Sequence, residues 1–368
     1  MTLSEILSQD KAIRHLKSML ATERIPPSLL FCGPAGCGKF PTAMAFAAAL
    51  NCTRIPYSPD EQKPKKQQSR PPEDDLFSMF GGDNSPAEEE KQVEEEQKET
   101  LLDVPLGEAC GKCLSCIQMA NGAHPDITIT GVEDQNLKTG KESGSLKVDT
   151  MREMLKKAYQ KSFLSPYKVF IVRDAEKLLP EAQNAILKTL EAPPEGTIII
   201  LICSDRNALL PTILSRAATV DFGPLSKEAM IRLLAKEDIT GKTAEFLAKA
   251  SQGSLDKARN IKIFIERAAR LPYGDRTNAL RFAAMLPTKE SHKAREETNA
   301  MLELMISRER EIWRDTPERQ SEYAKLINDT IHLRSLTNRN VSSQRILEAA
   351  LLASEAAGIS IERLLDIS

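Results

Sequence analysis

Apolar and polar positions follow two alternating patterns over residues 28–216. Short, mostly apolar runs of strand length are separated by segments in which apolar residues recur every three or four positions, as on one face of a helix. The expected strands are Ser28–Cys32, Asp126–Thr130, the run that starts at Lys168, and Thr197–Cys203, and the expected helices are Thr42–Leu50, Val148–Gln160 and Pro180–Glu191. This alternation predicts a parallel α/β sheet flanked by helices.

After residue 223 only helical spacing remains. We expect a small helical lid over 224–262, built from Glu228–Lys236, Ala244–Ser251 and a helix that begins near Ser254. An all-α domain follows over 263–368, with apolar helical positions at Ala279, Phe282 and Met285 and at Ile346, Ala349, Leu352 and Ala353. The pattern therefore divides the chain into three domains: 1–223, 224–262 and 263–368.

Residues 55–105 follow neither pattern. They are rich in Pro, Lys and Gln and then carry acidic runs at 88–90 and 94–96, a composition that cannot bury a core. We expect a disordered insertion, and a loop without a partner is favoured over an interaction tail. Because much of the acidic charge lies here, the formal net charge of −2 says nothing about nucleic-acid binding.

Length and composition indicate a multidomain protein. The chain has 368 residues, of which 41% are hydrophobic, enough for two or three domains. The longest apolar run, 198–203, is far below the roughly 20 residues of a membrane span, and no secretory leader is expected at the N-terminus. Seven cysteines, three of them clustered, favour a reducing compartment. We therefore expect a cytoplasmic protein.

Residues 33–40, Gly-Pro-Ala-Gly-Cys-Gly-Lys-Phe, have the spacing of a phosphate-binding loop between a strand and a helix. In such a loop Gly33, Gly36 and Gly38 let backbone N–H groups surround the phosphates, and Lys39 reaches the β and γ positions. The next residue should be a Ser or Thr that holds Mg²⁺, but here it is Phe40, which has no hydroxyl group. The expected nucleotide site is therefore degenerate.

Four cysteines bracket the insertion. Cys52 precedes it, and Cys110, Cys113 and Cys116 follow it as two overlapping CxxC steps. Four thiolates suit tetrahedral Zn²⁺, which we favour over an iron–sulfur cluster and over free thiols. With no open coordination position the metal would be structural. The segment His124-Pro125-Asp126 also suggests metal ligands, but a turn that leads into a strand is the favoured interpretation.

The stretch 182–216 carries a resemblance to a known family. It contains AQNAILKTLEAPPEG and then LLPTILSR, and in this it resembles the clamp-loader subunits of bacterial DNA polymerase III, which are AAA+ proteins. The resemblance covers most of the first 260 residues outside the insertion, and the cysteines match the zinc module of that family. It implies an AAA+ domain, a lid, and a helical collar through which five subunits form an open ring. It also implies a role in DNA replication as a component of the polymerase holoenzyme.

The family includes ATP-hydrolysing gamma/tau motors and non-hydrolysing delta prime subunits. Aligned with the motors, the Mg²⁺-binding Asp falls on Arg173 and the water-activating Glu on Asp174, while Asp256 replaces an arginine that senses the γ-phosphate. Together with Phe40, these departures favour the delta prime type, which is not an enzyme by itself. ATP binding through Lys39 is doubtful and Mg²⁺ binding is not expected.

Arg216, in the Ser-Arg pair that ends this stretch, matches the arginine that family members project into the ATP site of a neighbouring subunit. Without the resemblance it would be interpreted as a solvated surface charge. The resemblance implies gamma/tau and delta subunits as partners, and, through the complex, the sliding clamp and primed DNA. Two alternatives stay open: an ATP-hydrolysing gamma/tau-type motor, and a zinc-dependent nucleic-acid-binding module unrelated to any ring.

Overall fold

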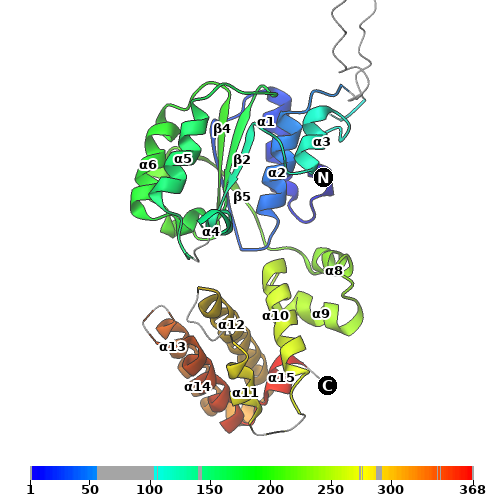
Figure 1. Cartoon of the computed structure of the whole chain (residues 1–368). Helices are drawn as coiled ribbons and strands as arrows, with labels where there is room; N and C mark the ends of the chain where they lie inside the picture. The colour runs from blue at the N-terminus through cyan, green and yellow to red at the C-terminus, as the bar shows by residue number, and fades with distance from the viewer. Residues whose placement is uncertain are drawn as a thin grey trace, which may run out of the picture.

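The computed structural model describes residues 2–55, 103–105, 107–139, 143–272, 275, 277–286, 292–337, 339 and 341–366. Figure 1 shows a sheet with its flanking helices above and a purely helical part below. Apart from position 55 and residues 103–105, the predicted insertion 55–105 lies outside the described residues. None of the helices in the described ranges combines the length and apolar character needed to cross a membrane.

The sheet has five strands in the order β2-β3-β4-β1-β5, and every pairing is parallel. The strands are β1 (Ser28–Cys32), β2 (Ile127–Thr130), β3 (Lys168–Val172), β4 (Thr197–Cys203) and β5 (Ala218–Asp221). Every residue of β1, β3 and β4 is buried, as expected for central strands covered on both faces. The parallel sheet is confirmed, whereas β5 was not predicted.

The register brings the carboxyl ends of the central strands to one edge. Cys32 at the end of β1 lies opposite Cys203 at the end of β4, and Val172 at the end of β3 lies opposite Leu201. The phosphate loop, Arg173 and Ser204 all follow directly from these ends. In parallel α/β sheets this edge is where ligands bind, so the topology places the candidate nucleotide site there.

Helices cover both faces of the sheet (Figure 1). One face carries α1 (Asp10–Thr22), α2 (Lys39–Leu50) and α3 (Leu114–Ala120), with the turn η1 (Leu3–Glu5) beside them. The other carries α5 (Val148–Ala158), α6 (Pro180–Glu191) and α7 (Pro211–Leu214), while α4 (Val132–Thr139), η3 (Ala175–Lys177) and η4 (Arg206–Ala208) complete this part. The predicted apolar face of α5 is buried as expected: Met151, Met154, Leu155 and Ala158.

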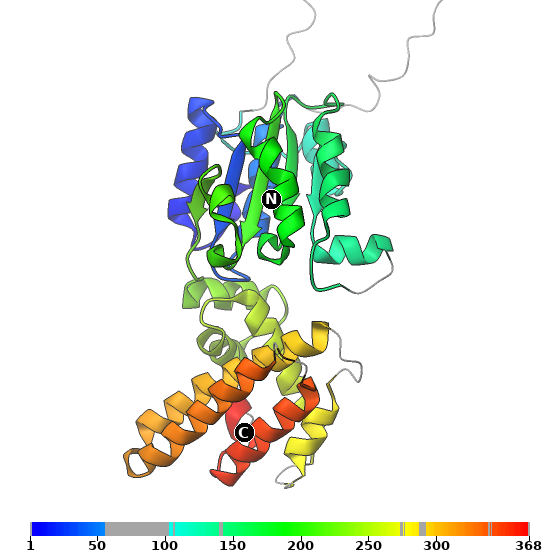
Figure 2. The ribbon, with the colours of Figure 1, turned by 90° about the vertical axis from the view of Figure 1, so that its left-hand side faces the viewer.

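The predicted lid, residues 224–262, contains α8 (Lys227–Ala235), α9 (Gly241–Ala250) and the start of α10 (Leu255–Ala268), close to the three predicted segments. Figure 2 shows α8 and α9, in yellow-green, between the sheet above and the long helices below. The proposed boundary at residues 262–263 falls inside the continuous helix α10, and a single buried cluster contains Met230, Leu247, Phe264 and Met305. Lid and collar therefore share one core.

The predicted collar contains α11 (Asn278–Ala284), α12 (His292–Asp315), η5 (Pro317–Arg319), α13 (Gln320–Leu336), α14 (Ser343–Ala356) and α15 (Ile361–Leu365). Ala279, Phe282 and Ile346 are buried as expected, but Met285, Ala349 and Leu352 are exposed. The expectation was wrong at Met285 because this residue follows the end of α11, and at Ala349 and Leu352 because α14 buries a face rotated by about one position. Contacts with α11, α12 and α13 select that face, and a single-helix pattern does not contain them.

Candidate functional site

The phosphate loop joins β1 to α2 and lies against the first turn of α10. The Leu255 N–H donates to the Gly36 carbonyl across 3.1 Å. Gly36 has φ +65°, and a Cβ built on it would lie 2.5 Å from the Asp256 nitrogen. Only glycine fits this close approach, because both the conformation and the space exclude a side chain. The start of α10 is therefore docked directly on the loop that should receive the phosphates.

Lys39 is buried and its ammonium group is bound by oxygens of the protein. Its Nζ donates to the Gly33 carbonyl at 2.7 Å and to the Pro34 carbonyl at 2.6 Å, and it lies 3.3 Å from the Ser204 hydroxyl. Sequence analysis did not include Ser204, although its place after a buried strand at the ligand-binding edge was a usable signal. A bound phosphate would have to compete with these three oxygens for the lysine.

Phe40 and Arg173, the two residues that replace the expected Mg²⁺ ligands, lie against each other. The guanidinium carbon of Arg173 is 5.2 Å from the centroid of the Phe40 ring, a cation–π arrangement. Arg173 also forms ion pairs with Asp134 at 3.0 Å and with Glu133 at 3.4 Å, both in α4. A hydrocarbon ring and a cation thus occupy the positions where a metal ion would need a hydroxyl group and a carboxylate.

Two acidic residues, Asp174 and Glu176, lie in the segment after β3, and the first of them pairs with a lysine. Asp174 lies 3.9 Å from Lys177, and Lys177 forms a second ion pair at 3.0 Å with Glu296 of the collar helix α12. Burial raises the pKa of the Glu176 carboxyl group above its usual range. One of its oxygens, Oε2, is buried and has no hydrogen-bond partner among the described residues. This segment connects the sheet to the collar.

Asp256 lies in the first turn of α10, which the Ser254 hydroxyl caps by accepting from the Lys257 N–H. Its Cγ would be 3.0 Å from a Cβ on Gly36, so the Asp256 side chain lies beside the loop. Arg259, one turn further along, is 3.5 Å from the Asp256 carboxylate. A carboxylate at this place would repel the phosphates of a nucleotide bound in the loop.

Arg216 follows α7, and its side chain contacts Glu191, Thr212 and Ser215 of the same sheet domain. Its Nη2 pairs with Glu191 at the end of α6 at 2.7 Å, and its Nη1 donates to the Thr212 carbonyl at 3.0 Å and to the Ser215 hydroxyl at 3.2 Å. The side chain is 35% exposed. Glu191 was not predicted as its partner, since helical spacing does not show which residues meet after a turn.

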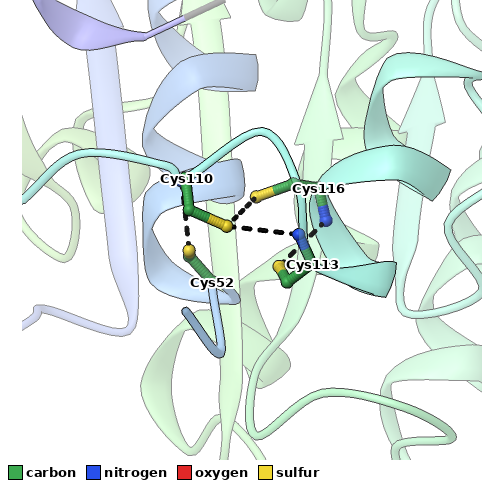
Figure 3. Close-up of side chains that lie close together, drawn as sticks. All are labelled: Cys52, Cys110, Cys113 and Cys116. Carbon is green, nitrogen blue, oxygen red and sulfur yellow. Dashed lines mark hydrogen bonds between the residues drawn. The ribbon is translucent and has the colours of Figure 1, made fainter. Parts of the chain in front are cut away.

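The four predicted cysteines come together in space (Figure 3). Their sulfur atoms all lie within 4.8 Å of one another, and the Cys110 and Cys116 sulfurs are 3.9 Å apart. Tetrahedral zinc with bonds of about 2.3 Å places its sulfur ligands about 3.8 Å apart. The thiols of Cys52, Cys110 and Cys113 accept backbone N–H groups, an arrangement that stabilises thiolates. The donor set and its spacing fit a structural Zn²⁺ ion.

Within the cluster the thiol hydrogen bond with Cys116 lowers the pKa of Cys52 to about 4, whereas the same contact and burial raise the pKa of Cys116. The cluster draws one ligand from just after α2 and three from the start of α3 and the turn before it. A metal ion here would fasten α3 to α2.

The segment His124-Pro125-Asp126 forms a turn that leads into β2, as expected. His124 Nε2 lies 3.0 Å from the Ser115 hydroxyl and 3.1 Å from the Ser165 hydroxyl, and burial lowers its pKa. The buried Asp126 carboxylate accepts three backbone N–H groups, from residues 163, 164 and 165, at 2.6, 2.7 and 2.8 Å. Both side chains therefore serve the fold.

A family model described as DNA polymerase III, delta subunit, matches residues 79–226. The gamma/tau subunit of Mycobacterium tuberculosis (strain H37Rv) is 27% identical over 235 residues, which are 64% of this chain and 31% of that relative. Delta prime subunits are also similar: that of Bacillus subtilis is 27% identical over 165 residues, 44% of this chain and 47% of the relative. That of Escherichia coli K12 is 34% identical over 130 residues, 35% of this chain and 37% of the relative.

Solved structures with a similar arrangement are more distant. A gamma subunit-related protein of Thermotoga maritima is 17% identical and has a TM-score of 0.43, over 64% of this chain and 87% of that one. A RuvB mutant from the same organism is 12% identical, with a TM-score of 0.40, over 97% of this chain and 91% of that one. The matches to the curated relatives cover 31% to 47% of their length.

Proposed function

We propose that this chain is a DNA polymerase III clamp-loader subunit of the delta prime type. In this role it takes part in clamp loading without hydrolysing ATP. The observation that carries the proposal is the contact between Phe40 and Arg173. These side chains stand where a hydrolysing subunit needs its two protein ligands to Mg²⁺, and they fill that place with each other. Phosphoryl transfer depends on positioning and on metal electrostatics, so their loss removes most of the catalysis.

The neighbouring residues support the same proposal. Lys39 is held by the Gly33 and Pro34 carbonyls, and the lid with Asp256 is docked on Gly36. A nucleotide would have to break these contacts and approach a carboxylate without a metal ion to screen it. We therefore expect ATP binding by this chain to be weak or absent and Mg²⁺ not to be bound.

In this proposal the chain acts on ATP through Arg216. An arginine supplied in trans stabilises the charge that develops on the transferred phosphoryl group, with effects of about 10³- to 10⁵-fold in other phosphate-loop systems. The partners would be gamma/tau and delta subunits in a five-membered AAA+ ring, with the sliding clamp and primed DNA as targets of the complex. The expected cytoplasmic location goes with this role.

Similarity to gamma/tau subunits supports one alternative, an ATP-hydrolysing motor, because the gamma/tau match extends over more of this chain than the delta prime matches do. The deciding experiment measures clamp- and DNA-stimulated ATP turnover in a loader reconstituted with cognate gamma/tau and delta subunits. We expect the isolated chain to be inert with Mg-ATP, and Arg216→Ala to lower turnover in an intact ring. Arg152→Ala, which changes an exposed arginine in α5, is the matched control.

Two results would overturn the proposal. Turnover by the isolated chain that disappears in Lys39→Ala would establish the motor. Unchanged turnover by an intact Arg216→Ala ring would remove the role of the arginine in trans. Tight, zinc-dependent DNA binding by the isolated chain would instead favour the nucleic-acid-binding module, whereas weak, salt-sensitive DNA contact would not.

We further propose that the four cysteines hold one structural Zn²⁺. The spacing of the sulfurs within 4.8 Å and the backbone N–H groups directed at them support this. Elemental analysis of protein purified without added metal should find one zinc per chain, absent in Cys113→Ser and retained in the control Cys37→Ser. Iron together with visible absorbance would indicate an iron–sulfur cluster instead. Protein without any metal would indicate that the four cysteines are free thiols.

A further inference from the structure

Two cysteines outside the metal cluster, Cys32 and Cys203, lie side by side at the carboxyl ends of β1 and β4. They are directly opposite in the parallel register, and their sulfur atoms are 3.4 Å apart, with the Cys203 thiol donating to the Cys32 sulfur. Both are free thiols. Neither takes part in the candidate nucleotide chemistry or in the proposed zinc site.

The backbone already has the spacing that a disulfide requires. Neighbouring strands lie about 4.8 Å apart, and disulfides join residues whose Cα atoms are about 4.4 to 6.8 Å apart. Closing the sulfur distance from 3.4 Å to the bonded value of about 2.05 Å needs a shift of about 0.7 Å from each sulfur. Such a shift is within the range of small side-chain rotations, so the two strands can stay paired.

The two thiols differ in the way that a reactive and a resolving cysteine differ. Cys32 is 9% exposed and lies near enough to Arg206 to interact with its guanidinium group. Cys203 is fully buried, and burial together with the hydrogen bond to Cys32 raises its pKa. Oxidants therefore meet Cys32 first, while Cys203 stays protonated next to it.

We propose that Cys32 and Cys203 are an oxidisable dithiol that closes to a disulfide when the protein meets a hydroperoxide. The Cys32 thiolate attacks one peroxide oxygen, which breaks the O–O bond and leaves a sulfenic acid on Cys32 and hydroxide in solution. The Cys203 sulfur then attacks the Cys32 sulfur and displaces the hydroxyl group, which leaves as water with the Cys203 proton. The two thiols are oxidised by two electrons and the peroxide is reduced.

The consequence reaches the phosphate loop, because each cysteine directly precedes a residue that binds Lys39. Gly33 follows Cys32 and supplies a carbonyl oxygen, and Ser204 follows Cys203 and supplies a hydroxyl oxygen. The Gly33 N–H also donates to the Cys203 carbonyl across 3.3 Å. A bond between the two sulfurs would hold both sides of this binding pocket for Lys39 in place.

The test uses the full zinc-loaded chain, treated with increasing hydrogen peroxide, alkylated, and digested with trypsin without reduction. We expect the peptides 25–39 and 189–206 to appear joined, lighter by two hydrogen atoms than their sum, and to separate on reduction. Because peptide 25–39 also contains Cys37, variants assign the bond: Cys32→Ala and Cys203→Ala should lose the joined peptide completely, and Cys37→Ser should keep it.

The measurement on unmodified protein is decisive even where a variant fails to fold. Absence of the joined peptide at peroxide levels that oxidise the four cluster cysteines would overturn the proposal. So would Cys32 found as a sulfinic acid with Cys203 still reduced, or a joined peptide that persists in Cys32→Ala.

Discussion

The contact between α10 and the phosphate loop can be tested by adding a single methyl group to the loop at Gly36. Gly36→Ala places a Cβ 2.5 Å from the Asp256 nitrogen and 2.9 Å from the Leu255 nitrogen, so the backbone of α10 must move away. Moving it breaks the hydrogen bond from the Leu255 N–H to the Gly36 carbonyl. Loss of that bond costs about 0.5–1.5 kcal/mol. The left-handed conformation also costs alanine about 1–2 kcal/mol, but Gly38→Ala carries a similar cost, so this part does not count toward undocking.

The lost hydrogen bond shifts the equilibrium from the docked toward the undocked state by about two- to tenfold. Hydrogen exchange of the Leu255 amide reports this directly, and its protection in Gly36→Ala should fall by about two- to tenfold. Gly38→Ala is the matched control, because Gly38 also has a positive φ, +99°, but its added Cβ meets nothing within 4 Å. Equal loss of protection in both variants, or none in Gly36→Ala, would refute the docking argument.

Three further outcomes are expected. A double-mutant cycle with Phe40→Ala and Arg173→Ala should give a coupling energy of about 0.5–2 kcal/mol in urea unfolding, and a value near zero would remove the stacking interaction. Asp126→Asn should lower the free energy of unfolding by about 3 kcal/mol, because an amide nitrogen replaces an oxygen that accepts backbone N–H groups, whereas Asp149→Asn on the surface should change it little. Burial raises the pKa of Glu309, so the folded state holds this proton more tightly than the unfolded state does. The free energy of unfolding should therefore fall as the pH rises above the pKa of the unfolded state. Urea midpoints measured between about pH 4.5 and 8 should show this fall, and Glu309→Gln should reduce it.

The sequence predicted those helices and strands whose bounds are marked by a local feature, such as a proline or a continuous apolar run. The bounds of α6 and β4 agree with the predicted ones, since Pro180 begins the helix, a pair of prolines ends it, and β4 is a continuous apolar run. The four-cysteine cluster was also predictable, because CxxC spacing already places sulfurs on one side of a turn. These are local properties of the chain.

Properties that depend on distant segments could not be predicted. The edge strand β5 is short and partly exposed, so it lacks the apolar run that identified the others. Each departure from the ATPase pattern was visible in the sequence, but the contact between Phe40 and Arg173 depends on the strand order. The same holds for Cys32 and Cys203, which only the register of β1 with β4 brings together.

The ion pair between Arg216 and Glu191 determines how much free energy a neighbouring subunit must supply to draw Arg216 into its ATP site. Arg216 is 35% and Glu191 53% exposed, and exposed ion pairs of this kind contribute about 0–1 kcal/mol. As far as this ion pair is concerned, the arginine is free for at least about one-sixth of the time, so the pair lowers the apparent affinity for an incoming phosphate by about sixfold at most. The chain can thus store its proposed catalytic group in a defined rotamer between encounters while giving up little of its availability.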